Sequence, residues 1–172
     1  MIITIGGLAG SGTTTAAEVL SKKLDIPYVS TGSIFREMAK ENGMSVIEFS
    51  KYAENNTDID IEIDKKQAEL AENSENLIIE GRLSAYFVNA DLKIWLTAPF
   101  DVRAKRICNR ESKSEEVAIR EIKIREDSEA LRYLDIHNIN INNLDIYDIL
   151  INTNRFVPES IAEIIFTTLK VI

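Results

Sequence analysis

The stretch Gly7-Leu8-Ala9-Gly10-Ser11-Gly12-Thr13-Thr14-Thr15 follows an apolar run at 1–5 and leads into a segment with helical spacing. The spacing Gly-x-x-x-x-Gly between a strand and a helix is typical of a phosphate-binding loop, because glycine lets backbone N–H groups turn toward phosphate oxygens. Such loops carry lysine at the position of Thr13, so this one lacks its usual positive charge. The alternative is a glycine-rich turn that only joins the two elements. The first interpretation predicts a phosphate site at the N-terminus of the following helix.

The composition sets the class of protein. The chain has 172 residues, 45% hydrophobic and 28% charged, which is ordinary for a single globular domain. Its formal net charge of −8 argues against a nucleic-acid backbone or an anionic membrane as the main partner, so we expect neither. The single cysteine, Cys108, excludes an internal disulfide, and no signal peptide or membrane-spanning run is visible. These observations predict a cytoplasmic protein with one domain over 1–172.

Short apolar runs alternate with helical patterns along the chain. Strand-like runs occur at 2–5, 28–30, 77–80, 92–96 and 149–152. Helical patterns occupy 14–24, 32–41, 45–53, 58–73, 99–110 and 114–133, and Pro158 opens a last helix. This alternation predicts an α/β fold, a three-layer sandwich with a mostly five-stranded parallel sheet covered by helices on both faces.

Two helical insertions are expected near the phosphate-binding loop. Ligands in open parallel sheets bind beyond the carboxyl ends of the strands, where these insertions lie. The helices at 32–73 would form a flap over the loop, and the arginine-bearing segment after the fourth strand would form a second, shorter flap. Of the nine arginines, six fall between Arg103 and Arg132, which indicates a local anion site in an acidic chain.

The arginines of this region fall on helix faces. The segment 99–110 places Arg103, Arg106 and Arg110 on one side, and the next helix does so with Arg125, Glu129 and Arg132. Two such faces near a phosphate loop would replace the charge that is missing at Thr13, together with a metal ion. The alternative is a solvated helix surface with Glu–Arg pairs.

Two more arginines and one carboxylate stand at ends of predicted strands. Arg36 lies one helical turn beyond Ser33, and Arg82 follows Glu80 at the carboxyl end of the third strand. At that position Glu80 would order magnesium, through water. The alternative for Glu80 is an exposed strand end with no ligand.

Taken together, these pieces resemble the nucleoside monophosphate kinases, most closely the archaeal-type cytidylate kinases, which have a P-loop fold. The matching motifs are Gly7-x-x-Gly10-Ser11-Gly12-Thr13-Thr14-Thr15, Ser30-Thr31-Gly32-Ser33-Ile34-Phe35-Arg36, Glu80-Gly81-Arg82, Arg103-x-x-Arg106-x-x-x-Arg110, Arg125-x-x-x-Glu129-x-x-Arg132 and Ile149-Leu150-Ile151-Asn152-Thr153. They occur in the family's order and cover nearly the whole chain. The resemblance implies a single P-loop kinase domain with an acceptor-binding flap at about 32–73 and a lid at about 106–125.

The same resemblance implies transfer of the ATP γ-phosphoryl group to CMP or dCMP. The loop from Gly7 to Thr15 would hold the ATP phosphates, with the hydroxyl of Thr14 or Thr15 near magnesium. Arg36 and Arg82 would hold the α-phosphate of the acceptor nucleotide. We expect a monomer, because small kinases with moving flaps rarely need a partner.

The resemblance also implies roles for the remaining arginines, either in catalysis or in closure of the lid over ATP. Arg103, Arg106 and Arg110 look like lid residues that close over ATP. Arg125 and Arg132 would bind the acceptor phosphate or the transferring group, and Glu129 would orient them or the acceptor. The archaeal-type kinases are similar in having threonine at position 13, whereas the bacterial pattern has aspartate where this chain has Glu129.

The base of the acceptor is not defined by these motifs. Candidate polar contacts on the flap are Ser33, Asp60, Asp64 and Gln67, and Ser33 and Asp64 are our expected substrate-binding residues among them. The alternative for the acidic ones is a solvated helix face. A kinase for AMP, UMP or a small metabolite, or a non-catalytic nucleotide-binding module, therefore remains an alternative. A P-loop GTPase is disfavoured, because the chain has neither an Asp-x-x-Gly nor an Asn-Lys-x-Asp motif.

Overall fold

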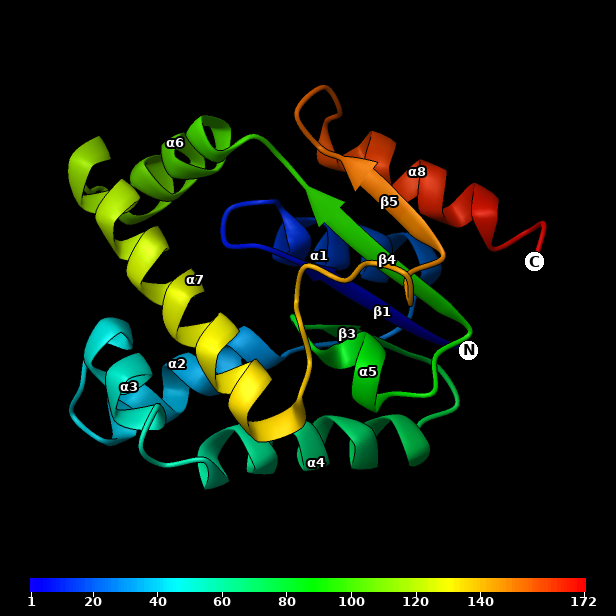
Figure 1. The fold of residues 1–172 in the computed structure, drawn as a ribbon. Coiled ribbons are helices and arrows are strands. Elements are labelled where there is room, and N and C mark those ends of the chain that lie inside the picture. Colours follow the sequence, from blue (N-terminus) through cyan, green and yellow to red (C-terminus); the bar gives the residue numbers. More distant parts are fainter.

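A computed structural model describes all of residues 1–172, and a five-stranded parallel sheet forms its centre (Figure 1). The strands are β1 (Ile2–Gly7), β2 (Tyr28–Ser30), β3 (Leu77–Glu80), β4 (Leu92–Thr97) and β5 (Ile149–Asn152). They lie in the order β2-β3-β1-β4-β5, and every pair is parallel. The predicted fold class and all five predicted strands are confirmed. Because β1 lies at the centre, the loop that follows it emerges at the middle of the sheet edge.

Eight helices connect or cover the strands. They are α1 (Thr13–Leu24), α2 (Thr31–Glu41), α3 (Val46–Ala53), α4 (Asp58–Glu72), α5 (Ser84–Phe87), α6 (Phe100–Glu111), α7 (Glu115–His137) and α8 (Pro158–Thr168). Two differ from the sequence prediction. The short α5 was not predicted, because four residues are too few to show a helical period. Helix α7 continues to His137, where Asn138 ends it in a left-handed conformation, φ 55°.

One face of the sheet packs against α1 and α8. Ile3 and Ile5 of β1 and Ile94 of β4 point to this face and are fully buried. Ala16, Ala17 and Leu20 of α1 complete the core together with Ile161 and Ile165 of α8. The small residues let the two helices approach the sheet closely. This face holds the largest apolar cluster and fixes the direction of α1, whose N-terminus carries the glycine loop.

The opposite face packs against α4, α5 and the segment at 138–148. Trp95 of β4 is 4% exposed, and its ring centroid lies 5.0 Å from that of Tyr147. Ala85 and Ile141 belong to the same cluster. The Ile- and Asn-rich segment at 138–148 therefore covers the second face of the sheet.

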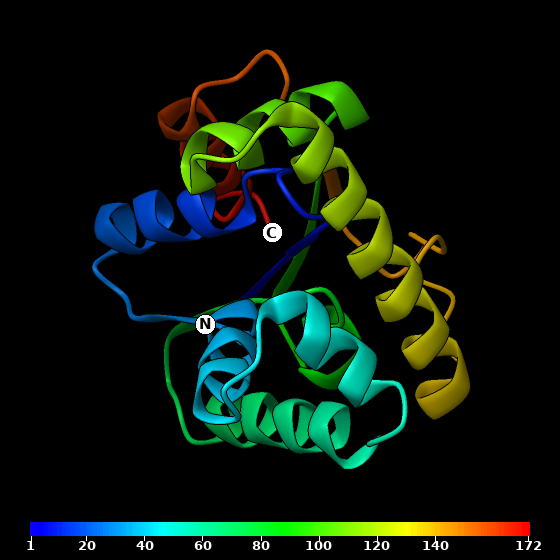
Figure 2. The ribbon, with the colours of Figure 1, turned by 90° about the vertical axis from the view of Figure 1, so that its left-hand side faces the viewer.

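Two groups of helices extend beyond the carboxyl ends of the strands (Figures 1 and 2). Helices α2 and α3 with the start of α4 form one group, and α6 with the first part of α7 forms the other. They meet where α3 packs against α7, and there Ser128 donates a hydrogen bond of 3.3 Å to the carbonyl oxygen of Ser50. No helix of the chain is both long enough and apolar enough to cross a membrane.

Candidate active site

The glycine loop wraps around the N-terminus of α1. Gly10 and Gly12 have φ angles of 81° and 96°, which favour glycine, and Gly12 is the N-cap of the helix. A side chain on Gly10 would also meet the backbone carbonyl oxygen of Arg103 at 2.6 Å. The first turn of α1 contains no acidic residue, so its free N–H groups and positive end face the loop unopposed. This geometry suits phosphate oxygens.

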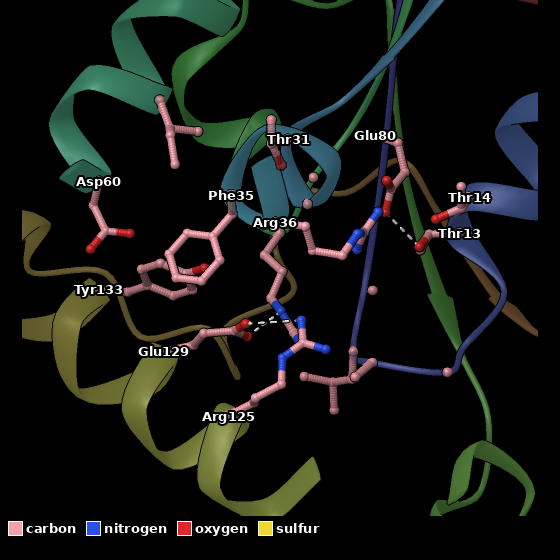
Figure 3. Close-up of a pocket in the computed structure, with 18 of the residues that line it drawn as sticks. Thr13, Thr14, Thr31, Phe35, Arg36, Asp60, Glu80, Arg125, Glu129 and Tyr133 are labelled. Carbon is pink, nitrogen blue, oxygen red and sulfur yellow. Dashed lines mark hydrogen bonds and ion pairs between the residues drawn. The ribbon is translucent and has the colours of Figure 1, made fainter. Parts of the chain in front are cut away.

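Glu80 connects three elements beside this loop (Figure 3). Its carboxylate accepts a hydrogen bond of 2.7 Å from the Thr13 hydroxyl and one of 2.5 Å from the Ser30 hydroxyl. The oxygen of Ser30 in turn accepts from the backbone N–H of Ser33, at 3.2 Å, and so caps α2. Glu80 is therefore held in one position at the carboxyl end of β3, rather than lying free at a strand end.

A cleft runs from the glycine loop toward α4. Its lining is Gly7, Leu8, Ala9, Gly10, Thr13, Thr14, Thr31, Gly32, Phe35, Arg36, Asp60, Ile63, Glu80, Gly81, Arg82, Arg110, Arg125, Glu129, Arg132 and Tyr133. The end near the loop is rich in arginine and hydroxyl groups, whereas the aromatic side chains lie toward α4 (Figure 3). The cleft thus has a polar end and an apolar end.

Positive charge is in excess in the middle of the cleft. Arg82 and Arg125 share one carboxylate, Glu129: Nε of Arg82 contacts Oε2, and Nη2 of Arg125 lies 3.6 Å from Oε1. Nη1 of Arg82 and Nε of Arg125 are buried and have no hydrogen-bond partner. Burial by itself would lower the pKa of Arg82, but the carboxylate of Glu129 raises it, so the guanidinium stays charged. Two cations with spare donors and one anion form a site for an anionic ligand.

Arg103 and Arg106 bind the glycine loop from behind. Nη1 of Arg103 donates to the carbonyl oxygen of Ala9 at 2.9 Å and pairs with Glu126 at 2.5 Å. Nη1 of Arg106 lies 3.3 Å from the carbonyl oxygen of Gly10 and 2.9 Å from the hydroxyl of Thr153. Neither side chain lines the first cleft. These two arginines therefore support the shape of the loop.

A second cleft lies on the other side of the loop. Residues 10–15 form its floor, and Arg106, Arg110, Thr153, Phe156 and Pro158 contribute to its walls. Thr14 lines both clefts, whereas Thr15 lines only the second and is exposed. Phe156 was missed from the sequence, because a lone aromatic residue in a loop carries no periodic signal.

The structure brings most of the predicted site residues to one of the two clefts. Three of them line neither: Arg103, Ser33 and Asp64. Ser33 accepts a hydrogen bond of 2.8 Å from Arg36, and so positions an arginine of the cleft. Phe35, Ile63 and Tyr133 line the first cleft but were not predicted as site residues, because aromatic and aliphatic side chains on helices are usually part of the core.

Asp64 lies behind the cleft in a pair with His137. Its Oδ1 accepts a 2.8 Å hydrogen bond from Gln67, and its Oδ2 lies 2.9 Å from Nε2 of His137 without the alignment of a hydrogen bond. Burial first, and then the charge of Asp60, raises the pKa of Asp64 to about 7, while burial lowers that of His137. The side chain of His137 is therefore mostly buried, at 14% exposed.

The glycine loop after the central strand, the sheet order and the two clefts define a phosphotransferase of the P-loop kinase class. A model of the cytidylate kinase-like family matches residues 2–155. The chain belongs to this family.

Similar sequences and similar solved structures support this assignment. The cytidylate kinase of Methanobrevibacter smithii is 74% identical over 172 residues, which are 100% of both chains. The cytidylate kinase of Methanothermobacter thermautotrophicus is 60% identical over 160 residues, 93% of this chain and 99% of that protein. The structure of shikimate kinase from Bacteroides thetaiotaomicron has a TM-score of 0.62 at 15% identity and covers 99% of this chain and 98% of its own. At that identity the last likeness shows the fold alone.

Proposed function

We propose that this protein transfers the γ-phosphoryl group of ATP to CMP or dCMP, giving CDP or dCDP and ADP. Support comes from the archaeal relatives, which are named cytidylate kinases and match over 93% and 100% of the chain. The two clefts that share the glycine loop give room for a donor and an acceptor nucleotide. In this proposal the donor base occupies the second cleft, beside Phe156, and the acceptor occupies the first.

The observation that carries the proposal is the arginine pair around Glu129. Arg82 and Arg125 lie in the cleft near the loop with unpartnered buried N–H groups. Phosphoryl transfer needs positive charge on the oxygens between donor and acceptor, and Thr13 supplies none. These two arginines replace the missing lysine charge and hold the acceptor phosphate in line with the γ-phosphorus. Glu129 keeps both guanidinium groups in place.

A magnesium ion fits the groups beside the loop. No cluster of three metal-binding side chains exists in the chain, but Mg²⁺ in kinases takes one or two protein oxygens and completes its shell with phosphate and water. Glu80 supplies a fixed carboxylate at the cleft wall, and the Thr14 hydroxyl lies nearby at the start of α1 (Figure 3). When bound, the ion would neutralise charge that develops on the β- and γ-phosphates. Thr14 is preferred to Thr15 because only Thr14 lines the cleft that contains Glu80.

Closure over the substrates completes the proposed mechanism. The flap at 32–73 carries Arg36, and the lid at 106–125 carries Arg110, whose side chain is 57% exposed and pairs with Glu111 at 2.6 Å. Movement of both toward the phosphates would add charge and exclude water, which limits ATP hydrolysis. We expect a monomeric cytoplasmic enzyme of pyrimidine nucleotide metabolism that needs no nucleic acid.

The test is ADP production from ATP and Mg²⁺ with CMP, dCMP, UMP, AMP, GMP and shikimate supplied separately. We expect rapid turnover with CMP and dCMP, with loss of activity on chelation of the metal. Turnover with another acceptor alone would keep the kinase chemistry and reject the cytosine assignment. ATP hydrolysis that no acceptor stimulates, or no reaction, would reject the proposed function as a whole.

A further inference from the structure

Three polar side chains on α4 lie on the face turned toward the rest of the protein, but only one reaches the acceptor cleft. Asp60, Asp64 and Gln67 are all buried and are spaced by one helical turn or less. Asp64 and Gln67 bond to each other, and Asp64 is closed off on its other side by His137. Asp60 alone lines the cleft. From sequence, Asp60, Asp64 and Gln67 were all candidates for a contact with the base, and the structure leaves only Asp60 in the cleft.

Asp60 is held by Arg132 in a nearly buried ion pair. Nε of Arg132 donates to Oδ2 at 2.7 Å, and Nη2 lies 3.5 Å from Oδ1, with the two side chains 3% and 7% exposed. Nη1 donates to the Ser128 hydroxyl at 2.8 Å and to the carbonyl oxygen of Ser50 at 3.3 Å. These bonds use four of the five N–H groups of a guanidinium. One N–H of Nη2 remains, next to an oxygen of Asp60 that can accept another bond.

The apolar end of the cleft surrounds this pair. Phe35, Ile63 and Tyr133 line it, and the guanidinium carbon of Arg132 lies 5.5 Å from the ring centre of Phe35 and 5.9 Å from that of Tyr133. Phe35 is fixed by an edge-to-face contact of 4.9 Å with Phe49. In the view of Figure 3, the two rings lie between Asp60 and the Glu129–Arg125 pair. A flat heterocycle fits here, whereas its phosphate fits at the arginine-rich end.

We propose that Asp60, positioned by Arg132, reads the amino edge of the acceptor base. The N4 amino group of cytosine would donate to Oδ1 of Asp60, and N3 would accept from the free N–H of Arg132. Uracil would place its O4 against the carboxylate and its N3–H against the guanidinium, so both contacts would fail. Adenine has the same donor–acceptor order as cytosine in a larger ring, so size must separate these two. The inference rests on the proposed function and assigns its base-specific residue.

The test compares kcat/KM for CMP and UMP in the wild type and in Asp60→Asn. The amide keeps the shape of the side chain but adds a donor that suits O4 of uracil. We expect kcat/KM for CMP to fall at least about tenfold and the CMP/UMP ratio to fall about 100-fold. The matched control is Asp58→Asn, the same change at an exposed position of the same helix, which should leave the ratio as in the wild type.

A second measurement needs no variant and so avoids a failure to fold. A CMP analogue with hydrogen in place of the N4 amino group should lose at least about tenfold in kcat/KM with the wild-type protein. In Asp60→Asn the analogue should lose little relative to CMP, because the contact is already gone. An equal loss for CMP and UMP in Asp60→Asn, or full activity of the analogue with the wild type, would overturn the inference. A wild type that phosphorylates no nucleoside monophosphate would instead contradict the proposed function.

Discussion

Two pairs of arginines lie within the same site and are used differently. Arg103 and Arg106 donate hydrogen bonds to backbone carbonyls of the glycine loop and to Glu126 and Thr153. Arg82 and Arg125 line the cleft, and each has a buried guanidinium nitrogen without a hydrogen-bond partner. Proximity to a phosphate loop therefore does not by itself show that an arginine supplies charge to a ligand. What decides is whether the N–H groups are already satisfied by the protein.

The largest effect is expected from the pair that faces the cleft. In Arg125→Met, kcat at saturating ATP and CMP should fall about 10²–10³-fold, because a charge aimed at the transferring group is lost. Stability should change little, since the contact of Arg125 with Glu129 is long, at 3.6 Å. The measurements are steady-state kinetics and thermal unfolding.

The control for this variant is Arg120→Met. Arg120 lies on the same helix, is exposed and lines neither cleft beside the glycine loop. Its kcat should stay within about twofold of the wild type, as for most surface positions. A kcat for Arg125→Met that also stays near the wild-type value would remove Arg125 from the site.

The supporting pair should respond in the opposite manner. Arg103→Met leaves Glu126 and the carbonyl of Ala9 without their partner, so we expect a loss of about 3 kcal/mol in the free energy of unfolding. KM for ATP should rise more than KM for CMP, because the loop loses its support. Urea unfolding and kinetics measure both quantities.

A loss of kcat without a loss of stability in Arg103→Met would contradict a purely supporting role for Arg103. If Arg103→Met keeps the stability of the wild type and loses as much kcat as Arg125→Met, both arginines act on the transferring group. The double variant Arg103→Met, Glu126→Gln refines the test, since neutralising Glu126 should restore part of the lost stability.

These two classes of arginine could not be separated from sequence. The helical spacing places Arg103, Arg106 and Arg110 on one side of α6, but it does not say what faces them. Arg103 and Arg106 face backbone carbonyl oxygens of the glycine loop, which lies nearly a hundred positions earlier in the chain. The strands, in contrast, were predictable, because burial on both faces leaves uninterrupted apolar runs. Glu80 was also placed correctly, since it ends such a run.

The smallest effect is expected at Asp64, which lies behind the cleft. Its pKa of about 7 lies above the ordinary aspartate value of 3.8, so the folded state binds the proton more tightly than the unfolded chain. This group therefore adds stability at low pH that is lost as the pH rises toward 7. Relative to Asp64→Asn, the wild type should lose about 1–2 kcal/mol between pH 5 and pH 7. Urea unfolding at both pH values checks this, and equal pH slopes for the two proteins would contradict it.

Helix α7 has a consequence for the timing of the reaction cycle. It has 23 residues, a length of about 34 Å, and contains neither glycine nor proline. Its first turns pack on α6 beside the second cleft, while Arg132 bonds to α3 and α4 at the far end of the first. A rod without a hinge transmits a tilt from one end to the other. If the proposed donor nucleotide tilts this helix on binding, the affinity for the acceptor would change, and the acceptor would change the affinity for the donor by the same factor.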